Sequence, residues 1–185
     1  MTLQLSVAEI DAALPRLQRG LPQYLWLQSQ VANSREFHRD AVFRRRYNHF
    51  YRVRRGANWQ EVFYGLMGRA KTEQLGFGAI LNELKNATNR YEASFASKLI
   101  ATMDPSKPII DAMVLKNLDL RLPPFTSADR SLGICIVYSK LISLFTAFLN
   151  TEMGEHLVNA FNRTYPNSNI SRVKMLDLVL WQKRD

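Results

Sequence analysis

Apolar side chains recur at intervals of three and four residues along almost the whole chain, which is the spacing of one face of an α-helix. After Gly76, for example, Ile80, Leu81 and Leu84 fall on one face of a predicted helix. Alternation of apolar and polar residues, which indicates a strand, is missing apart from the ambiguous stretch 134–138. The pattern therefore predicts an all-α protein, folded as a compact multi-helix domain.

Capping residues and helix breakers set the limits of the expected helices. Ser6 can cap a first helix, which Pro15 kinks or stops early, and Asn33 or Ser34 can cap the third. Gly133 is expected to interrupt the longest helix, because glycine weakens a helix interior. The other helices are expected over 23–30, 59–71, 77–85, 94–103, 111–118, 128–150, 151–163 and 171–181.

The length and composition bound the number of domains. A chain of 185 residues with 46% hydrophobic residues fits one domain with a substantial core. Neither internal repeats nor low-complexity tracts occur. We therefore expect a single α-helical domain over residues 1–185. A division into two helical subdomains with a cleft between them would fall near residues 120–127, in a loop that contains two prolines.

Arginines are concentrated between residues 35 and 55. Eight arginines against Glu36 and Asp40 give this segment a charge of +6, which is two thirds of the formal net charge of +9. Planar guanidinium groups bind phosphate oxygens in pairs, so such a segment can follow the backbone of a nucleic acid. DNA, as a double strand, is the expected partner. The candidate contacts are Arg44, Arg45, Arg46, Arg52, Arg54 and Arg55.

The same segment also has an ordinary structural interpretation. Aromatic residues recur among the arginines and predict a face that packs on the core. These aromatic residues are Phe43, Tyr47, Phe50 and Tyr51. Arginines on the opposite, solvated face need no ligand, and some of them can pair with Glu61, Glu73 or Glu83.

Composition excludes several classes of site. With Cys135 as the only cysteine, the chain can form no internal disulfide, no cysteine-ligated zinc site and no four-cysteine iron–sulfur cluster. The apolar setting of Cys135 predicts a buried, unreactive side chain. His38, His49 and His156 are too dispersed in the sequence to form a metal-binding motif. We therefore expect no metal and no cofactor.

The N-terminus and the apolar runs bear on location. The first residues lack the basic start and apolar core of a signal peptide, and no apolar run approaches the roughly 18 residues of a membrane span. A single cysteine fits a reducing compartment. We expect a cytoplasmic protein with no membrane partner.

Asp111 is the carboxylate whose position suggests chemistry. Pro105 and Pro108 restrict the preceding backbone to a turn, and Asp111 falls where an N-cap side chain accepts hydrogen bonds from backbone N–H groups. A carboxylate held in this way can stabilise an oxocarbenium-like sugar or orient a water molecule against it. Aspartate is also among the best N-caps, so a purely structural role explains the same pattern.

A resemblance to a known family lies in two neighbouring stretches. These are Ala93-Ser-Phe-Ala-Ser-Lys-Leu-Ile100 and Lys107-Pro-Ile-Ile-Asp111-Ala-Met-Val-Leu-Lys-Asn-Leu118. Together they resemble the core of the helix-hairpin-helix DNA glycosylases, in which a helix leads into a Pro-Ile/Val-Xaa-Asp turn. The resemblance implies an α-helical glycosylase fold, a flipped base read in a pocket between two helical subdomains, and Asp111 at the position of the catalytic aspartate.

Two departures from the family pattern refine what the resemblance implies. The glycine-rich hairpin before the first helix is replaced by Asn89-Arg-Tyr-Glu-Ala-Ser, so the backbone contact of that hairpin to phosphate is not expected. The hydroxyls of Ser94 and Ser97, or Lys98, could replace part of it. Phe95 stands where bifunctional members carry a lysine that forms a Schiff base. The resemblance therefore implies a monofunctional glycosylase that uses water.

Three functions stay open on the sequence alone. The first is a glycosylase-like DNA-binding protein that excises a base through Asp111, with Trp181 as the candidate side chain for stacking on that base. The second is a non-catalytic nucleic-acid-binding scaffold in repair or defence, in which Asp111 is only a helix cap. The third is a helical protein-interaction module whose basic helix docks on an acidic partner.

Overall fold

The computed structural model describes residues 2–33 and 36–183, and within those ranges the chain is helical and contains no strand. The all-α prediction is confirmed. The helices are α1 (Val7–Ala13), the 3₁₀ helix η1 (Leu14–Leu17), α2 (Leu21–Asn33), α3 (Ala41–Tyr51), α4 (Ala57–Glu73), α5 (Phe77–Thr88), α6 (Ala93–Met103), α7 (Ala112–Asn117), α8 (Arg130–Leu149), α9 (Glu152–Thr164) and α10 (Arg172–Gln182).

The chain divides into two compact units. Unit 1 comprises Met1–Arg19 and Pro105–Asp185, and unit 2 is the continuous stretch Gly20–Asp104. Unit 2 is therefore inserted between two parts of unit 1. Residues 120–127, where the sequence analysis placed a division, form part of the loop between α7 and α8 inside unit 1.

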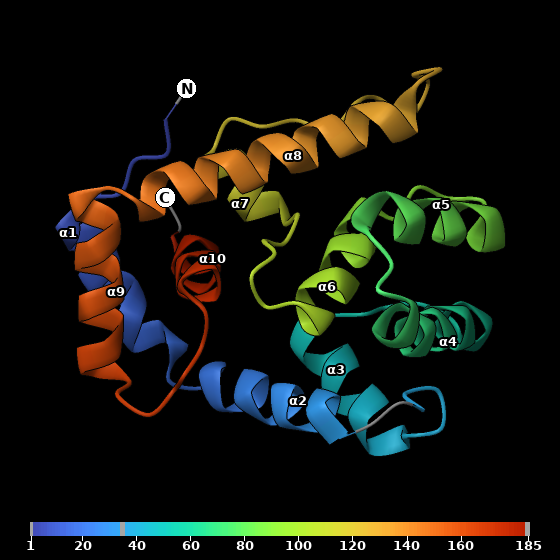
Figure 1. Cartoon of the computed structure of the whole chain (residues 1–185), viewed down its shortest axis with the longest axis horizontal. Coiled ribbons are helices and arrows are strands. Elements are labelled where there is room, and N and C mark those ends of the chain that lie inside the picture. Colours follow the sequence, from blue (N-terminus) through green and yellow to red (C-terminus); the bar gives the residue numbers. More distant parts are fainter. Residues whose placement is uncertain (1, 34–35, 184–185) are drawn as a thin grey trace. The chain divides into compact units, whose positions relative to one another are not determined.

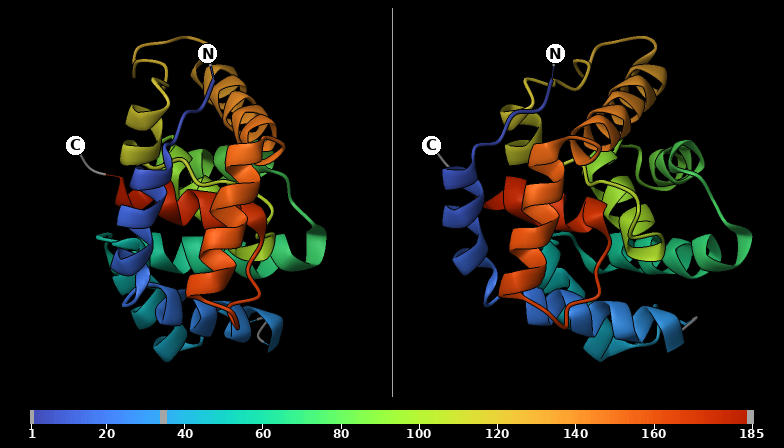
Figure 2. Two further views of the ribbon diagram at one scale, coloured as in Figure 1. Left: turned by 90° about the vertical axis from the view of Figure 1, so that its left-hand side faces the viewer. Right: turned by 60° about the vertical axis from the view of Figure 1, so that its left-hand side comes forward.

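Helix α10 is the central helix of unit 1. It contacts η1, α1, α7, α8 and α9, and α1 runs beside α9 (Figure 1, Figure 2). Every residue of α10 from Lys174 to Leu180 is buried, as expected for a helix that is covered on several sides. The other helices of unit 1 contribute buried apolar side chains, among them Ile10, Leu14, Leu17, Ile134, Leu141, Phe145, Leu157 and Phe161.

Hydrogen bonds join the two parts of unit 1 that are far apart in sequence. The Tyr165 hydroxyl donates to the carbonyl of Leu14 at 2.6 Å. Arg16 Nη1 donates to the carbonyl of Gln182 at 3.1 Å. These bonds attach the N-terminal helices to α10 and to the segment after α9, so the first 19 residues belong to the same core as the last 81.

Helix α8 is continuous, which corrects the interruption expected at Gly133. A Cβ atom on Gly133 would lie 2.9 Å from Cγ of Pro123, so the absence of a side chain allows the preceding loop to pack against the helix. The ambiguous stretch 134–138 is helical as part of α8. Cys135 is half-buried and not fully buried as expected, and partial desolvation raises the pKa of its thiol.

Within the described residues, α8 is long and apolar enough to cross a membrane by length and composition. It has 20 residues, a mean hydropathy of 1.9 over its most apolar window, and 39% of that window is buried. The expectation that no apolar run approaches the length of a membrane span is therefore wrong. Core helices of soluble proteins have the same length and composition, and eight residues of α8, including Ile134, Leu141 and Phe145, are buried.

Unit 2 has a core rich in aromatic rings. Tyr47 of α3 is fully buried, and its ring centroid lies 4.6 Å from that of Tyr51 and 5.8 Å from those of Phe63 and Tyr64. Burial raises the pKa of the Tyr47 hydroxyl, which lies 3.4 Å from the Thr102 hydroxyl of α6. The prediction that the aromatic face of the arginine segment packs on the core is confirmed.

The start of α3 differs from the prediction. Asn33 is the last residue of α2, and Ser34 lies outside the described residues. Asp40 is the N-cap of α3, and its Oδ1 accepts a hydrogen bond from the N–H of Phe43 at 2.8 Å. The helix therefore begins later than the predicted caps imply, and Phe37 lies in the turn before it, where its side chain is buried.

Candidate functional site

Helix α3 divides its side chains between the core and the solvent. Its buried residues are Phe43, Tyr47, Phe50 and Tyr51. The exposed residues Val42, Arg45, Arg46 and His49 recur at intervals of three and four and share the opposite face. The helix ends at Arg52, which is exposed and has a left-handed backbone with a φ of 54°.

A groove of about 400 Å³ lies beside α3 in unit 2. Its lining residues are His38, Arg39, Ala41, Arg44, Arg45, Asn48 and Gln60. Asn48 Nδ2 donates to Gln60 Oε1 at 2.9 Å, and the Tyr64 hydroxyl donates to Asn48 Oδ1 at 2.6 Å. Because α4 holds the amide side chains in this way, the groove has a fixed polar wall next to three arginines.

Three arginines of the segment are bound by acidic residues of unit 2. Arg39 Nη1 donates to Glu36 Oε1 at 3.1 Å. Arg44 Nη1 donates to Glu61 Oε1 at 2.6 Å and to the carbonyl of His38 at 2.9 Å. Arg55 Nη2 donates to Glu92 Oε2 at 3.1 Å, where the Glu92 side chain is nine-tenths buried. These ion pairs position the helix and the following loop, so Arg44 and Arg55 contribute less charge to the surface than the sequence suggests.

Three further arginines face the solvent. Arg45 and Arg54 are exposed and have no partner among the described residues. Arg46 is exposed and its guanidinium carbon lies 4.1 Å from the centroid of the Trp26 ring of α2. The expected pairing with Glu61 is confirmed, whereas Glu73 and Glu83 pair with Arg69 of α4. Arg35 lies outside the described residues.

The candidate contacts on α6 differ in accessibility. Ser94 is half-buried, but Ser97 is fully buried, and its hydroxyl donates to the carbonyl of Ser94 at 2.9 Å. A buried hydroxyl cannot reach a phosphate group, so the prediction of Ser97 as a phosphate contact is wrong. Lys98 Nζ donates to the carbonyl of Tyr51 at 3.3 Å and lies 5.0 Å from the centroid of the Phe95 ring. Lys98 therefore ties α6 to the end of α3.

Asp111 is the N-cap of α7 in unit 1, as predicted. Its Oδ1 accepts a hydrogen bond from the N–H of Met113 at 2.8 Å, and the residue is half-buried. The preceding turn is fixed at two points, because the Tyr138 hydroxyl donates to the carbonyl of Pro108 at 3.1 Å and the N–H of Ile109 donates to the Asp177 carboxylate at 3.4 Å. The carboxylate therefore has a defined orientation.

The buried ion pair behind this turn was not found from the sequence. Lys174 Nζ lies 2.7 Å from Oδ2 of Asp177, and their side chains are 4% and 8% exposed. Both residues are on α10, three positions apart, which is a common spacing for exposed helical ion pairs. Only the fold shows that this face of α10 is covered. Trp181, the predicted base-stacking residue, lies half-buried near the end of the same helix.

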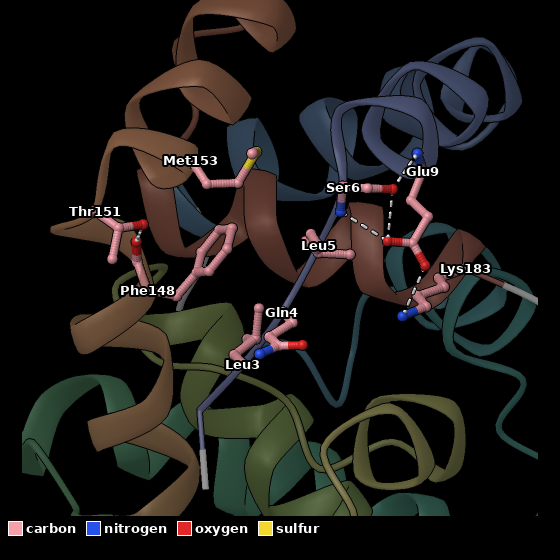
Figure 3. A pocket seen from close by; sticks show the side chains of 9 residues that line it. All are labelled: Leu3, Gln4, Leu5, Ser6, Glu9, Phe148, Thr151, Met153 and Lys183. Atoms are coloured by element: carbon pink, nitrogen blue, oxygen red, sulfur yellow. Dashed lines mark hydrogen bonds and ion pairs between the residues drawn. The ribbon is translucent and has the colours of Figure 1, made fainter.

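A second cavity, of about 600 Å³, lies in unit 1 where the N-terminal segment passes the junction of α8 and α9 (Figure 3). Its apolar lining residues are Leu3, Leu5, Phe148 and Met153. Its charged groups bind one another, because Glu9 accepts a hydrogen bond from the Ser6 N–H at 2.7 Å and pairs with Lys183 at 2.9 Å. No residue predicted as a site from the sequence lines this cavity.

In the part of the chain that the structure describes, no group of three or more histidine, cysteine, aspartate or glutamate side chains is placed to hold a metal ion. Comparisons with protein-family models, with curated proteins and with solved structures gave no match. Unit 2 holds the arginines, Ser94 and Lys98, and unit 1 holds Asp111 and Trp181.

Proposed function

We propose that this protein binds the phosphate backbone of a nucleic acid through α3 and the loop that follows it. The observation that supports the proposal is that Arg45 and Arg54 are exposed and have no partner among the described residues, whereas Arg44 and Arg55 are held by ion pairs with Glu61 and Glu92. Paired arginines position the element, and unpaired arginines are available to a polyanion.

The charge distribution of unit 2 supports the same proposal. Unit 2 has 13 basic and 7 acidic residues, a net charge of +6, and residues 35–55 alone account for that value with 8 basic and 2 acidic residues. The remainder of the unit is neutral. A phosphate chain would therefore be attracted to one segment and not to the unit as a whole.

The groove beside α3 is a concave surface that can hold a ligand next to the basic segment. Arg45, which has no partner among the described residues, lines it together with Arg39, which pairs with Glu36. The Asn48 and Gln60 amides also line it, and each amide nitrogen donates one N–H within unit 2 and has a second N–H that can donate to a ligand. Arginine contacts to phosphate fix the position of a nucleic acid, while amide side chains also bind sugar and phosphate oxygens. We expect one phosphate to occupy this groove.

The test is a binding titration of a labelled oligonucleotide against arginine variants. Arg45→Ala and Arg54→Ala are each expected to weaken binding several-fold at moderate salt, because each removes about one phosphate contact. Arg163→Ala is the matched control, since Arg163 is also exposed and without a partner among the described residues but lies on α9 of unit 1. Equal affinities for all three variants would contradict the proposal.

We propose base excision through Asp111 as a second function, which would make the protein a DNA glycosylase. One observation favours it: only Oδ1 of Asp111 accepts a hydrogen bond from the described residues, so Oδ2 is available to a ligand. In this reaction the oxygen of a water molecule bonds to the sugar C1′ as the bond to the base breaks, and a proton of that water ends on the departing base. The carboxylate stabilises the positive charge that develops on the sugar.

Asp111→Asn separates catalysis from capping. Asparagine caps helices about as well as aspartate, so we expect unchanged thermal stability together with the loss of abasic-site formation on damaged duplex DNA. Release of base by the variant at the wild-type rate would contradict the catalytic assignment. If the wild type binds DNA but releases no base, the phosphate-binding function is still supported and the base-excision function is wrong.

A further inference from the structure

A guanidinium–indole stack stands next to the unpaired arginine on α3. Arg46 of α3 lies over the ring of Trp26 of α2, with 4.1 Å between the guanidinium carbon and the ring centroid. Trp26 is half-buried and Arg46 is exposed. The guanidinium group therefore contacts the face of the indole ring, while the Arg46 residue stays exposed to the solvent.

The stack and the phosphate-binding arginine belong to the same exposed side of the helix. Successive residues of an α-helix are about 100° apart around its axis, so Arg45 and Arg46 are neighbours on the exposed arc of α3. Val42 and His49 lie on that arc between them, and both are exposed. A strand that crosses α3 can thus contact Arg45 with a phosphate and Arg46 with an adjacent base.

We propose that this face binds single-stranded nucleic acid, with one base stacked on the Arg46–Trp26 pair and a neighbouring phosphate on Arg45. Bases present their flat faces only when they are unstacked, and proteins that bind single strands place aromatic rings or guanidinium planes against those faces. In a duplex the base faces are covered by their neighbours. The inference rests on the proposed phosphate-binding function. It replaces duplex DNA, the partner expected from the sequence, with a single strand.

The chemistry of the ligand follows from these contacts. A stack on a guanidinium group tolerates any base, because every base has a π-face. Besides the arginines, His49 and the groove residue Asn48 are the exposed or half-buried residues of α3 whose side chains can donate to the sugar or the base. We therefore expect a site of low sequence preference that uses the backbone charge and the base plane together.

The experiment compares two strands of the same charge. One is a labelled oligothymidylate of about 12 nucleotides, and the other is a strand of equal length in which every base is missing. The wild type is expected to bind the strand with bases about 5- to 150-fold more tightly, as stacking contributes about 1–3 kcal/mol per base. Anisotropy of the label measures both affinities in the same buffer.

Two substitutions test the stack. Arg46→Lys keeps the charge but removes the planar group, so we expect loss of most of the preference for the strand with bases while the salt dependence stays unchanged. Trp26→Ala is expected to have the same effect, and Trp26→Phe to retain part of the preference. If Trp26→Ala lowers the thermal stability, Arg46→Lys still decides the matter, because Arg46 is exposed.

The outcomes distinguish this inference from the function on which it rests. Equal wild-type affinity for the two strands, or a preference that survives Arg46→Lys, would overturn the stacking site. A duplex bound more tightly than the single strand would also overturn it. Each of these three results leaves the phosphate-binding proposal standing as long as Arg45→Ala weakens binding to both strands equally.

Discussion

Neighbouring arginines of α3 have different surroundings. Some of their charges are used in contacts within the protein, and others are available to a ligand. Arg44 donates both to Glu61 and to a backbone carbonyl, whereas the next residue, Arg45, is exposed without a partner among the described residues. Arg46 lies over Trp26. The sequence predicts the charge of all three but not their partners, because Glu61 and Trp26 belong to other helices.

At the scale of single residues, two glycines provide a matched test of packing. A Cβ on Gly154 would lie 2.3 Å from the carbonyl oxygen of Phe148 and 2.7 Å from Cα of Leu149, which are backbone atoms that cannot move aside cheaply. Gly154→Ala is therefore expected to lower the free energy of unfolding by about 1–3 kcal/mol or more.

Gly65 is the control for that substitution. It lies inside α4, and a Cβ there would meet nothing within 4 Å. Gly65→Ala is expected to raise the free energy of unfolding by about 0.5–1 kcal/mol, because alanine favours the helix. Urea denaturation measures both variants. A Gly154→Ala protein as stable as the wild type would show that α8 and α9 do not approach as closely as described.

At the scale of elements, local signals in the sequence predicted most helix starts. Ser6, Asp111, Thr151 and Ser171 are N-caps whose side chains accept hydrogen bonds from the first turns of α1, α7, α9 and α10. The failures have tertiary causes. Gly133 lies inside α8 and leaves room for Pro123, and such a contact leaves no mark on the local pattern.

Glu9 takes part in the capping of α1 and pairs with Lys183 at the end of α10. The contribution of Glu9 to the stability of the folded protein therefore depends on pH. The backbone N–H of Ser6 and the side chain of Lys183 lower the pKa of the Glu9 carboxyl from 4.5 to about 2. At pH values above 4.5, the ordinary pKa of a glutamate carboxyl, the ionised carboxylate therefore stabilises the folded protein. That contribution is lost as the pH falls from 4.5 through about 2.

Glu9→Gln tests this contribution. We expect the variant to unfold more easily than the wild type at about pH 6, and the difference in free energy of unfolding to shrink towards about pH 2. Denaturant titrations across this range give the difference, and nuclear magnetic resonance of the carboxyl carbon gives the pKa directly. A difference that is constant with pH would contradict the role of the ionised group.

At the scale of the whole molecule, the fold class followed from periodicity, but the organisation into units did not. Unit 1 combines the first 19 residues with the stretch from Pro105 onwards. The Tyr165 hydroxyl bonds to the carbonyl of Leu14, 151 positions away in the sequence. Pairings over such separations depend on which helix faces are complementary, and amphipathic patterns do not specify their partners.

The candidate site, too, was predictable from the sequence only in part. The arginine segment and the cap role of Asp111 were evident from residue type and spacing. The groove was not, because Gln60 reaches it from α4, and neither was the burial of Ser97. The net charge is also unequal between the units, at +3 for unit 1, with 12 basic and 9 acidic residues, and +6 for unit 2.

The most direct test of the central claim, that exposed arginines on and after α3 bind phosphate groups, is the affinity of the wild-type protein for an oligonucleotide across a range of salt concentrations. If three or four arginines each displace a counterion, the logarithm of the association constant falls against the logarithm of salt concentration with a slope of about −3. A slope near zero, or no binding even at low salt, would contradict the account.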